Sequence, residues 1–147
     1  MFFGQFEHII DAKGRLTIPS NFRDMLPDGI FVMQGFDGNL TVYPKEHFEH
    51  IAANTGKMSI TDSDTRLLRR FLFSKTVKLE FDSAGRILLP SYLREFAHLD
   101  SNVVIIGAYD NFEIWSPELW HKQEELMNDP QANASRWDAL DVSAKWE

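Results

Sequence analysis

The sequence of 147 residues contains no cysteine and no long apolar run. The absence of cysteine excludes disulfide bonds, thiolate metal ligands and a cysteine nucleophile. No apolar stretch approaches the roughly 20 residues that span a bilayer. The segment Met1–Gly4 has neither the basic start nor the apolar stretch of a secretory signal. We therefore expect a cytoplasmic protein with no membrane partner.

Positive charge is also scarce, since 15 lysines and arginines face 22 acidic residues and the net charge is -7. Such a balance argues against a polyanionic partner, which the overall field would repel. The charge is unevenly distributed, however, because residues 66–86 carry a net +4 and residues 113–147 a net -5. A charge run is more typical of a solvated face than of a binding site, so charge alone does not predict a nucleic-acid partner.

Enzyme signatures are missing as well. The sequence has no P-loop, no dinucleotide-binding fingerprint and no Gly-x-Ser-x-Gly elbow. The pair His47 and His50 has a metal-like spacing, but no third ligand can be identified and Phe48 and Ile51 fit a buried stripe. We expect no enzymatic activity, no metal, no cofactor and no small-molecule substrate. Acid–base catalysis by two acidic residues that lie close together in space stays open as an alternative.

The sequence contains an internal duplication. The segment Asp11–Arg23 returns 71 residues later as Asp82–Arg94, with six of thirteen positions identical. A second block, residues 35–44, parallels residues 107–115 with an offset of 72. Each copy is too short to bury a good core alone, so we expect the two copies to fold against each other.

Hydrophobic patterning predicts the same order of elements in each copy. Alternating apolar and polar residues predict short strands on both sides of the Asp-x-x-Gly-Arg loop. Apolar residues at helical spacing predict a short helix that starts at the Ser of Pro-Ser, and turn-forming residues predict a hairpin after it. The expected strands are 6–10, 16–18, 30–34 and 40–43 in the first copy, and 77–81, 87–89, 103–106 and 112–115 in the second. The expected short helices are 20–26 and 91–98, and a further helix follows each hairpin after Pro44 or Pro117.

The segment 61–74 joins the copies and has the pattern of an amphipathic helix. Arg66, Arg69 and Arg70 fall on one side of the helical wheel, while Leu67, Leu68, Phe71 and Leu72 fall on the other. We predict a secondary basic face on this helix. After Pro130 no firm periodicity appears, so residues 131–147, with Trp137 and Trp146, are expected to form either a docked helix or a loose acidic tail.

The repeated loop is the candidate binding site. Asp11 and Asp82 can accept hydrogen bonds from backbone N–H groups two residues on, and Gly14 and Gly85 tolerate a positive φ. A tight turn of this kind would hold the following arginine, Arg15 or Arg86, rigidly. Arginine can meet guanine O6 and N7, or a phosphate, with two hydrogen bonds.

A competing interpretation leaves the loop without any partner. In it, Asp11 pairs with Arg15 and Asp82 with Arg86, so that each turn satisfies only itself. The two loops also differ, because Lys13 adds a base to the first loop where Ala84 stands in the second. If the loops bind nucleic acid, we expect the first to contribute more of the affinity.

These residues resemble the bacterial MraZ family of transcription regulators. The resemblance rests on the Asp-x-x-x-Arg motifs Asp11–Arg15 and Asp82–Arg86, each followed by an apolar triplet and Pro-Ser, and on the connector 66–74, which ends in Arg-Arg-Phe-Leu-Phe-Ser. It extends from the N-terminus to about Trp120.

The resemblance implies a mainly β fold with short helices (α+β), in which two tandem AbrB-like units form a swapped-hairpin β barrel. It further implies a ring-shaped homo-oligomer associated with the nucleoid. Members bind guanine-rich direct repeats in double-stranded DNA upstream of the division and cell-wall gene cluster and generally repress it. Arg15 and Arg86, with Lys13 beside the first, become the expected DNA contacts.

The expected division of the chain has four parts. They are a first AbrB-like repeat (1–55), a helical connector (56–75), a second AbrB-like repeat (76–122) and a C-terminal helix or acidic tail (123–147). A different functional class also fits the residues, namely a ring-forming adaptor or antitoxin-like module that binds proteins through its aromatic side chains. Substitution of Arg15 by alanine separates the two hypotheses, because only DNA binding depends on it.

Overall fold

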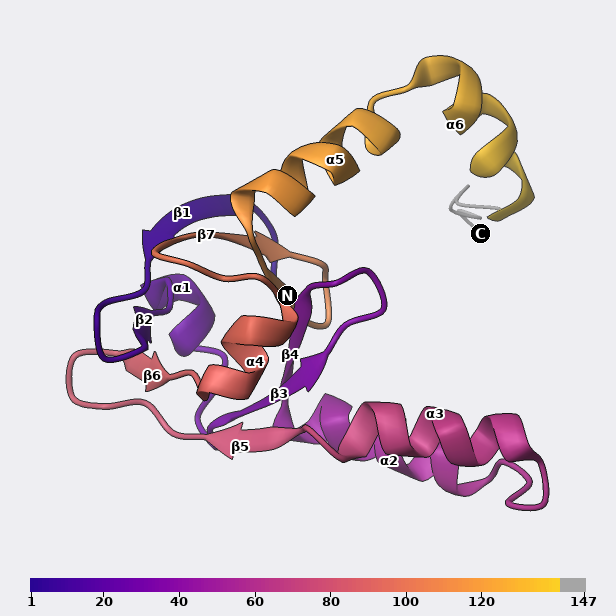
Figure 1. The fold of residues 1–147 in the computed structure, drawn as a ribbon, viewed down its shortest axis with the longest axis horizontal. Helices are drawn as coiled ribbons and strands as arrows, with labels where there is room; N and C mark the ends of the chain where they lie inside the picture. Colours follow the sequence, from indigo (N-terminus) through magenta and orange to yellow (C-terminus); the bar gives the residue numbers. More distant parts are fainter. Residues whose placement is uncertain (141–147) are drawn as a thin grey trace, which may run out of the picture. The chain divides into compact units, whose positions relative to one another are not determined.

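The structure, a computed structural model, describes residues 1–140, so the last part of the expected tail, with Trp146, lies outside the described residues. The chain forms two compact units, Met1–Ser116 and a second unit that starts at Pro117. Figure 1 shows the elements of each unit.

Both repeats have four strands and a short helix in the first unit, in the same order, and the first repeat adds a longer helix after its hairpin. In the first repeat these are β1 (Gln5–Ile9), β2 (Arg15–Thr17), α1 (Ser20–Arg23), β3 (Ile30–Gln34), β4 (Leu40–Pro44) and α2 (Lys45–Gly56). After α3 (Ser63–Phe73), the second repeat contributes β5 (Val77–Leu79), β6 (Arg86–Leu88), α4 (Ser91–Phe96), β7 (Asn102–Gly107) and β8 (Phe112–Trp115). The α+β class and the tandem repeats are confirmed.

The repeats exchange strands in the main sheet. Its strand order is β1-β7-β8-β4-β3-β5, so the first strand of each repeat pairs with the hairpin of the other repeat. β1 is antiparallel to β7, and β5 is antiparallel to β3. Each repeat therefore completes the sheet of the other, which explains why one copy alone would leave strands unpaired.

The strands do not close into a single barrel. β1 and β5 are the two edges of the six-stranded sheet, and β2 and β6 pair with each other as a separate two-stranded ribbon. An isolated bridge between Ile10 and Leu16 links the ribbon to the end of β1. The expected barrel is thus corrected to an open sheet with a ribbon, because the tight turn after residue 10 sends β2 toward β6 and away from the main sheet.

The core lies between the sheet, the ribbon and the two short helices. Leu16 and Ile87, the central pair of the ribbon, are fully buried, as are Phe22 of α1 and Leu93 of α4. The Phe22 ring contacts those of Phe2 and Phe112 at centroid distances of 5.2 Å in both cases. Side chains from both repeats therefore share one core, and the ribbon and the short helices are fixed by the same contacts.

The short helices end earlier than the sequence predicts. α1 ends at Arg23, and the chain continues to Leu26 through bonds from Met25 N to Phe22 O and from Leu26 N to Arg23 O. Pro27 follows, and a proline disfavours a helical residue before it. α4 ends at Phe96 because His98 adopts a φ of 53°, in the left-handed region where helices terminate.

Helices α2 and α3 form a hairpin that packs against β3 and β4 (Figure 1). Asp62 caps the N-terminus of α3 by accepting a hydrogen bond from the backbone N–H of Asp64. On β3, the Phe31 ring stacks on that of Phe48 in α2, with centroids 4.1 Å apart. These contacts hold the helical hairpin on one side of the sheet.

The second unit contains α5 (Pro117–Met127), α6 (Pro130–Arg136) and a 3-10 turn at Asp138–Leu140. Asp129 caps α6 by accepting from the N–H groups of Gln131 and Ala132. Arg136 donates from Nη1 to the carbonyl of Leu126, 2.9 Å away. The described part of the expected tail is therefore helical. In residues 1–140, no helix combines the length and the apolar character that crossing a membrane requires.

Candidate functional site

The two Asp-x-x-x-Arg loops form nearly identical turns. Asp11 Oδ1 accepts from the backbone N–H groups of Lys13 and Arg15, both at 2.9 Å. Its other oxygen accepts from Arg15 Nε at 2.6 Å. Gly14 closes the turn with a φ of 84°, a conformation that glycine adopts without strain. The aspartate thus fixes both the backbone of the turn and the direction of the arginine.

The second loop repeats this geometry. Asp82 Oδ1 accepts from the N–H groups of Ala84 and Arg86 at 2.9 Å, and Asp82 Oδ2 accepts from Arg86 Nε at 2.8 Å. Gly85 has a φ of 75°. The same residue types at the same spacing therefore produce the same turn in each repeat.

Each Asp–Arg pair engages the guanidinium through its Nε atom. About a third of the Arg15 and Arg86 side chains is exposed, at 34% and 32%. Each pair uses Nε, and no described residue accepts a hydrogen bond from the two terminal nitrogens of either arginine. The Asp–Arg pairing that the competing interpretation predicts is present. It orients the arginine through Nε and leaves the two terminal nitrogens able to donate to a ligand.

The ribbon brings the two arginines onto one face. Arg15 lies opposite Leu88 and Arg86 lies opposite Thr17, on either side of the buried pair Leu16 and Ile87. Side chains alternate along a strand, so Arg15 and Arg86 point to the side away from the core. As diagonal neighbours of an antiparallel pair, their Cα atoms are roughly 7–8 Å apart. The two loops form one surface, a juxtaposition that sequence spacing could not reveal.

Each loop is also braced by the short helix of the other repeat. Gly85 O accepts from Ile18 N at 3.2 Å, and Gly14 O accepts from Leu89 N at 3.0 Å. A Cβ atom at Gly85 would lie 1.8 Å from Arg23 Nη1, and one at Gly14 would lie 3.1 Å from Arg94 Cζ. The last arginine of each repeated segment therefore packs its guanidinium against the glycine of the opposite turn.

Arg23 and Arg94 are residues of the site that the sequence analysis did not assign. Their signal was their identity in both copies of the repeated segment, but only the strand exchange shows what they contact. Together with Lys13, Arg15 and Arg86 they give the turns five basic groups against two acidic groups, Asp11 and Asp82. We call these seven residues the turn surface. It carries a net charge of +3 in a chain whose total is negative.

The electrostatics of the turn surface favours ionised aspartates. The N–H of Arg15 contributes most to lowering the pKa of Asp11 below its ordinary value of 3.8, and the Arg15 guanidinium and the N–H of Lys13 act in the same direction against partial burial. The N–H and the guanidinium of Arg86 lower the pKa of Asp82 in the same way. Both carboxylates therefore remain charged, and both arginines stay oriented, at neutral pH.

Lys13 is exposed at the tip of the first turn, where Ala84 occupies the matching place in the second. The backbone of each position donates to the aspartate in the same manner. The first turn therefore has one more exposed positive charge than the second, with no change in turn geometry.

The arginines of α3 serve the helical hairpin. Arg69 donates from Nε and Nη2 to the carbonyl of Thr55, and Arg66 donates from Nη1 to the carbonyl of Ile60. Leu67, expected on the inward side, is 60% exposed. Two of the three arginines of the predicted secondary basic face thus bind backbone carbonyls near the end of α2 and in the loop after it, and only Arg70 lacks such a contact among the described residues.

The histidine pair of α2 gains no further ligand. His47 is half-buried and His50 is exposed. Among residues 1–140, no group of three histidine or acidic side chains could hold a metal ion.

Comparison with known proteins identifies the family of the chain. The model of a family described as "MraZ protein, putative antitoxin-like" matches the chain twice, over residues 1–71 and 72–140. A protein of Roseiflexus castenholzii named transcriptional regulator MraZ is 44% identical over 135 residues, which are 92% of both chains.

Two further relatives carry the same name. The protein of Thermomicrobium roseum is 42% identical over 86% of this chain and 89% of its own length. That of Lactiplantibacillus plantarum is 40% identical over 84% of this chain and 88% of its own. The two family matches, the two repeats and the paired Asp-x-x-x-Arg turns agree, and the chain belongs to the MraZ family of transcriptional regulators.

Proposed function

We propose that the chain is a sequence-specific DNA-binding regulator whose turn surface contacts double-stranded DNA. The observation that carries this proposal is the placement of Arg15 and Arg86 on one exposed face, each with Nε held by an aspartate and its terminal nitrogens available. The names of the relatives support transcriptional regulation as the setting.

The chemistry of the turn surface favours guanine. Two parallel N–H donors of an arginine match O6 and N7 of guanine in the major groove, a contact worth about 1–3 kcal/mol of discrimination. Lys13, Arg23 and Arg94 add positive charge around the two arginines, which suits phosphate contacts that position the protein. The overall charge of -7 then opposes binding only weakly, because salt screens charges beyond about 8–10 Å.

The proposal extends to the operator and the assembly. We propose that the chain acts as a repressor of the division and cell-wall gene cluster through guanine-rich direct repeats, as a ring-shaped homo-oligomer associated with the nucleoid in the cytoplasm. Several turn surfaces on one oligomer would bind repeats at matching spacing with a combined affinity above that of a single surface. Apolar side chains of the first unit that are exposed in the single chain, such as Phe3, Ile9 and Tyr109, would be buried in contacts between copies.

The four-part division of the chain, with repeats at 1–55 and 76–122, a connector at 56–75 and a tail at 123–147, stays part of the same proposal. The secondary basic face of Arg66, Arg69 and Arg70 on α3 also stays a prediction.

The experiment is a fluorescence anisotropy titration of the full chain with a duplex from the region upstream of its own gene. We expect tight binding whose log K falls against log[salt] with a slope of about -0.9 for each phosphate neutralised. Replacing guanine by 7-deazaguanine, which lacks the N7 acceptor, should weaken binding about tenfold or more at contacted positions. A flat salt dependence, or equal affinity for the 7-deazaguanine duplex, would contradict direct guanine recognition.

A further inference from the structure

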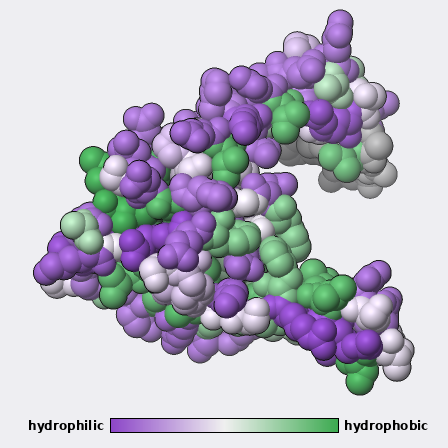
Figure 2. Space-filling view, in the orientation of Figure 1, coloured by the Kyte–Doolittle hydropathy of each residue, from purple (hydrophilic) through white to green (hydrophobic). Residues whose placement is uncertain are grey.

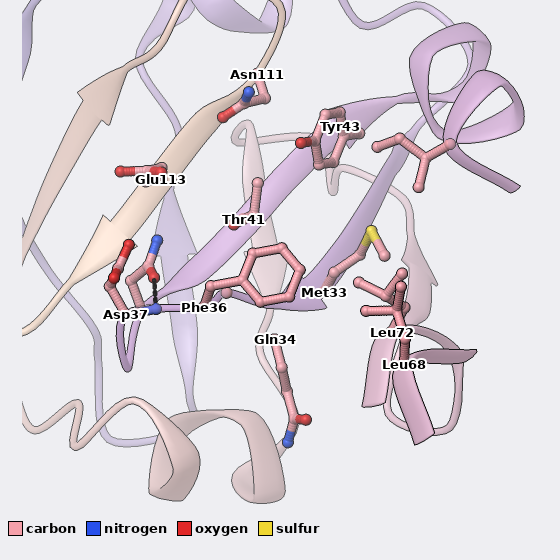
Figure 3. Close-up of a pocket in the computed structure, with 13 residues that line it drawn as sticks. Met33, Gln34, Phe36, Asp37, Thr41, Tyr43, Leu68, Leu72, Asn111 and Glu113 are labelled. Carbon is pink, nitrogen blue, oxygen red and sulfur yellow. Dashed lines mark hydrogen bonds between the residues drawn. The ribbon is translucent and has the colours of Figure 1, made fainter. Parts of the chain in front are cut away.

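A pocket of about 320 Å³ lies between the β3–β4 hairpin, the neighbouring strand β8 and the helical hairpin, and none of its lining residues belongs to the Asp-x-x-x-Arg turns. Its volume is at the lower end of the range for small-molecule sites. Figure 3 shows polar side chains, including Thr41, Tyr43, Asn111 and Glu113, on one side of it, and Met33, Leu68 and Leu72 on another. The pocket thus has one polar and one apolar wall.

The polar wall is rich in acceptors. Asn111 is only 9% exposed, and its Oδ1 is buried without a hydrogen-bond partner, while its Nδ2 donates to Asp110 Oδ1 at 2.7 Å. The equivalent residue of the first repeat, Asn39, uses its Oδ1 to accept from the N–H of Asp37. An unpaired buried acceptor is costly, and a donor bound in the pocket would satisfy Asn111 where the fold does not.

Glu113 adds negative charge beside Asn111. Its Oε1 accepts from Trp115 Nε1 at 3.0 Å, and Asn39 also donates to the carboxyl group. Burial raises the pKa of Glu113, and the charge of Asp37 raises it further. Burial likewise raises the pKa of the Tyr43 hydroxyl, and the negative charges of Asp110 and Glu113 raise it further. No basic residue is among those that line the pocket.

The apolar wall continues onto the surface. Phe36, at the tip of the β3–β4 hairpin, is 74% exposed and stacks on Phe71 of α3 with centroids 5.6 Å apart. Figure 2 shows hydrophobic surface over this hairpin and the adjoining helical hairpin. A ligand that places a charged group against the polar wall can therefore bury an apolar body against α3.

We infer that this pocket binds a small organic cation, an ammonium or guanidinium group attached to a short aromatic or branched apolar body. The cation would donate to Asn111 Oδ1 and to the carboxylate of Glu113, and its body would pack between Phe36 and Leu68. The pocket shares no residue with the turn surface, so this inference does not depend on DNA binding.

The test is isothermal titration calorimetry of the full chain with phenethylammonium chloride. We expect saturable binding, and at least tenfold weaker binding of 2-phenylethanol and of 3-phenylpropionate, which keep the ring but lack the cation. Absence of saturable binding, or equal binding of 2-phenylethanol, would overturn the inference.

Two variants locate the site. Glu113→Gln should weaken phenethylammonium binding about tenfold or more, while Glu95→Gln, the same change at an exposed position of α4, should leave it unaltered. Leu68→Arg, at a half-buried position of α3, should abolish binding by placing a cation in the pocket, and it tests the site even if Glu113→Gln fails to fold. Unchanged affinity in a folded Glu113→Gln or Leu68→Arg protein would show that the cation binds elsewhere.

Discussion

At the residue scale, each turn is defined by an aspartate that binds two N–H groups and one guanidinium, and by a glycine with a positive φ. The sequence predicts these features, because Asp-x-x-Gly-Arg combines residues with known turn preferences. It could not predict that Arg23 packs on Gly85 and Arg94 on Gly14, since these contacts join residues that are 62 and 80 positions apart.

The glycine contact gives a stability prediction. Gly85→Ala should reduce the free energy of unfolding by about 1–2 kcal/mol, because an L-residue is strained at this φ, and Arg23 must also move away from the new Cβ. Gly14→Ala should cost less, since its Cβ has more room beside Arg94. Urea unfolding measures both variants, and a larger loss for Gly14→Ala would contradict the asymmetric packing.

The lowered pKa of Asp11 predicts a pH dependence of the turn. A carboxylate with a depressed pKa in the folded state stabilises it above the ordinary value of 3.8, and this contribution disappears as the pH falls through the folded-state pKa. Carbon-13 NMR of the labelled Asp11 carboxyl should show titration below 3.8. The Asp11→Asn variant should lose part of the stability difference between pH 7 and pH 3, and titration of Asp11 at or above 3.8 would contradict the turn geometry.

At the element scale, the hairpins β3–β4 and β7–β8 and the helices after them agree closely with the patterns of apolar residues and turn formers. The differences lie at the ends of elements. β5 stops at Leu79, where its pairing with Ile30–Val32 of β3 ends, although the alternation continues to Phe81. Leu67 is exposed, whereas Leu72 of the same helix is buried and Arg69 donates to the carbonyl of Thr55. Such tertiary contacts have no periodic signal in the sequence.

The helix α1 gives the element-scale prediction. It has only four residues, so packing and not helix propensity must hold it in place. Phe22→Ala should lower the free energy of unfolding by about 3–5 kcal/mol, because the fully buried ring fills the space between Phe2 and Phe112. The exposed Asn21→Ala variant of the same helix is the control. A loss for Phe22→Ala as small as that for Asn21→Ala in urea unfolding would show that α1 is not anchored by the core.

At the scale of the whole molecule, the duplication predicts that the two repeats fold against each other. In the structure they do so by exchanging strands in the main sheet. The position of the turns follows from it, since the ribbon of β2 and β6 takes one strand from each repeat. The sequence alone could suggest a barrel from the resemblance but not the open sheet, because closure depends on which strand edges meet.

The strand exchange predicts that the repeats cannot fold separately. A fragment of residues 1–75 leaves β1 and β3 without their partners β7 and β5, so it should lack the dispersed amide spectrum of a folded protein. Mixing it with residues 76–116 should restore that spectrum. A well-dispersed spectrum from residues 1–75 alone, with no change on mixing, would contradict the exchange.

The most direct test of the turn surface compares the DNA affinity of Arg15→Ala, Arg86→Ala and the double variant, with Lys57→Ala, an exposed position at the end of α2, as control. Anisotropy titrations should show about tenfold or greater weakening for each single arginine variant, more for Arg15 because Lys13 accompanies it, and loss of sequence-specific binding for the double variant. Lys57→Ala should bind as the unmodified chain does. Unaltered affinity in the folded double variant would contradict the account.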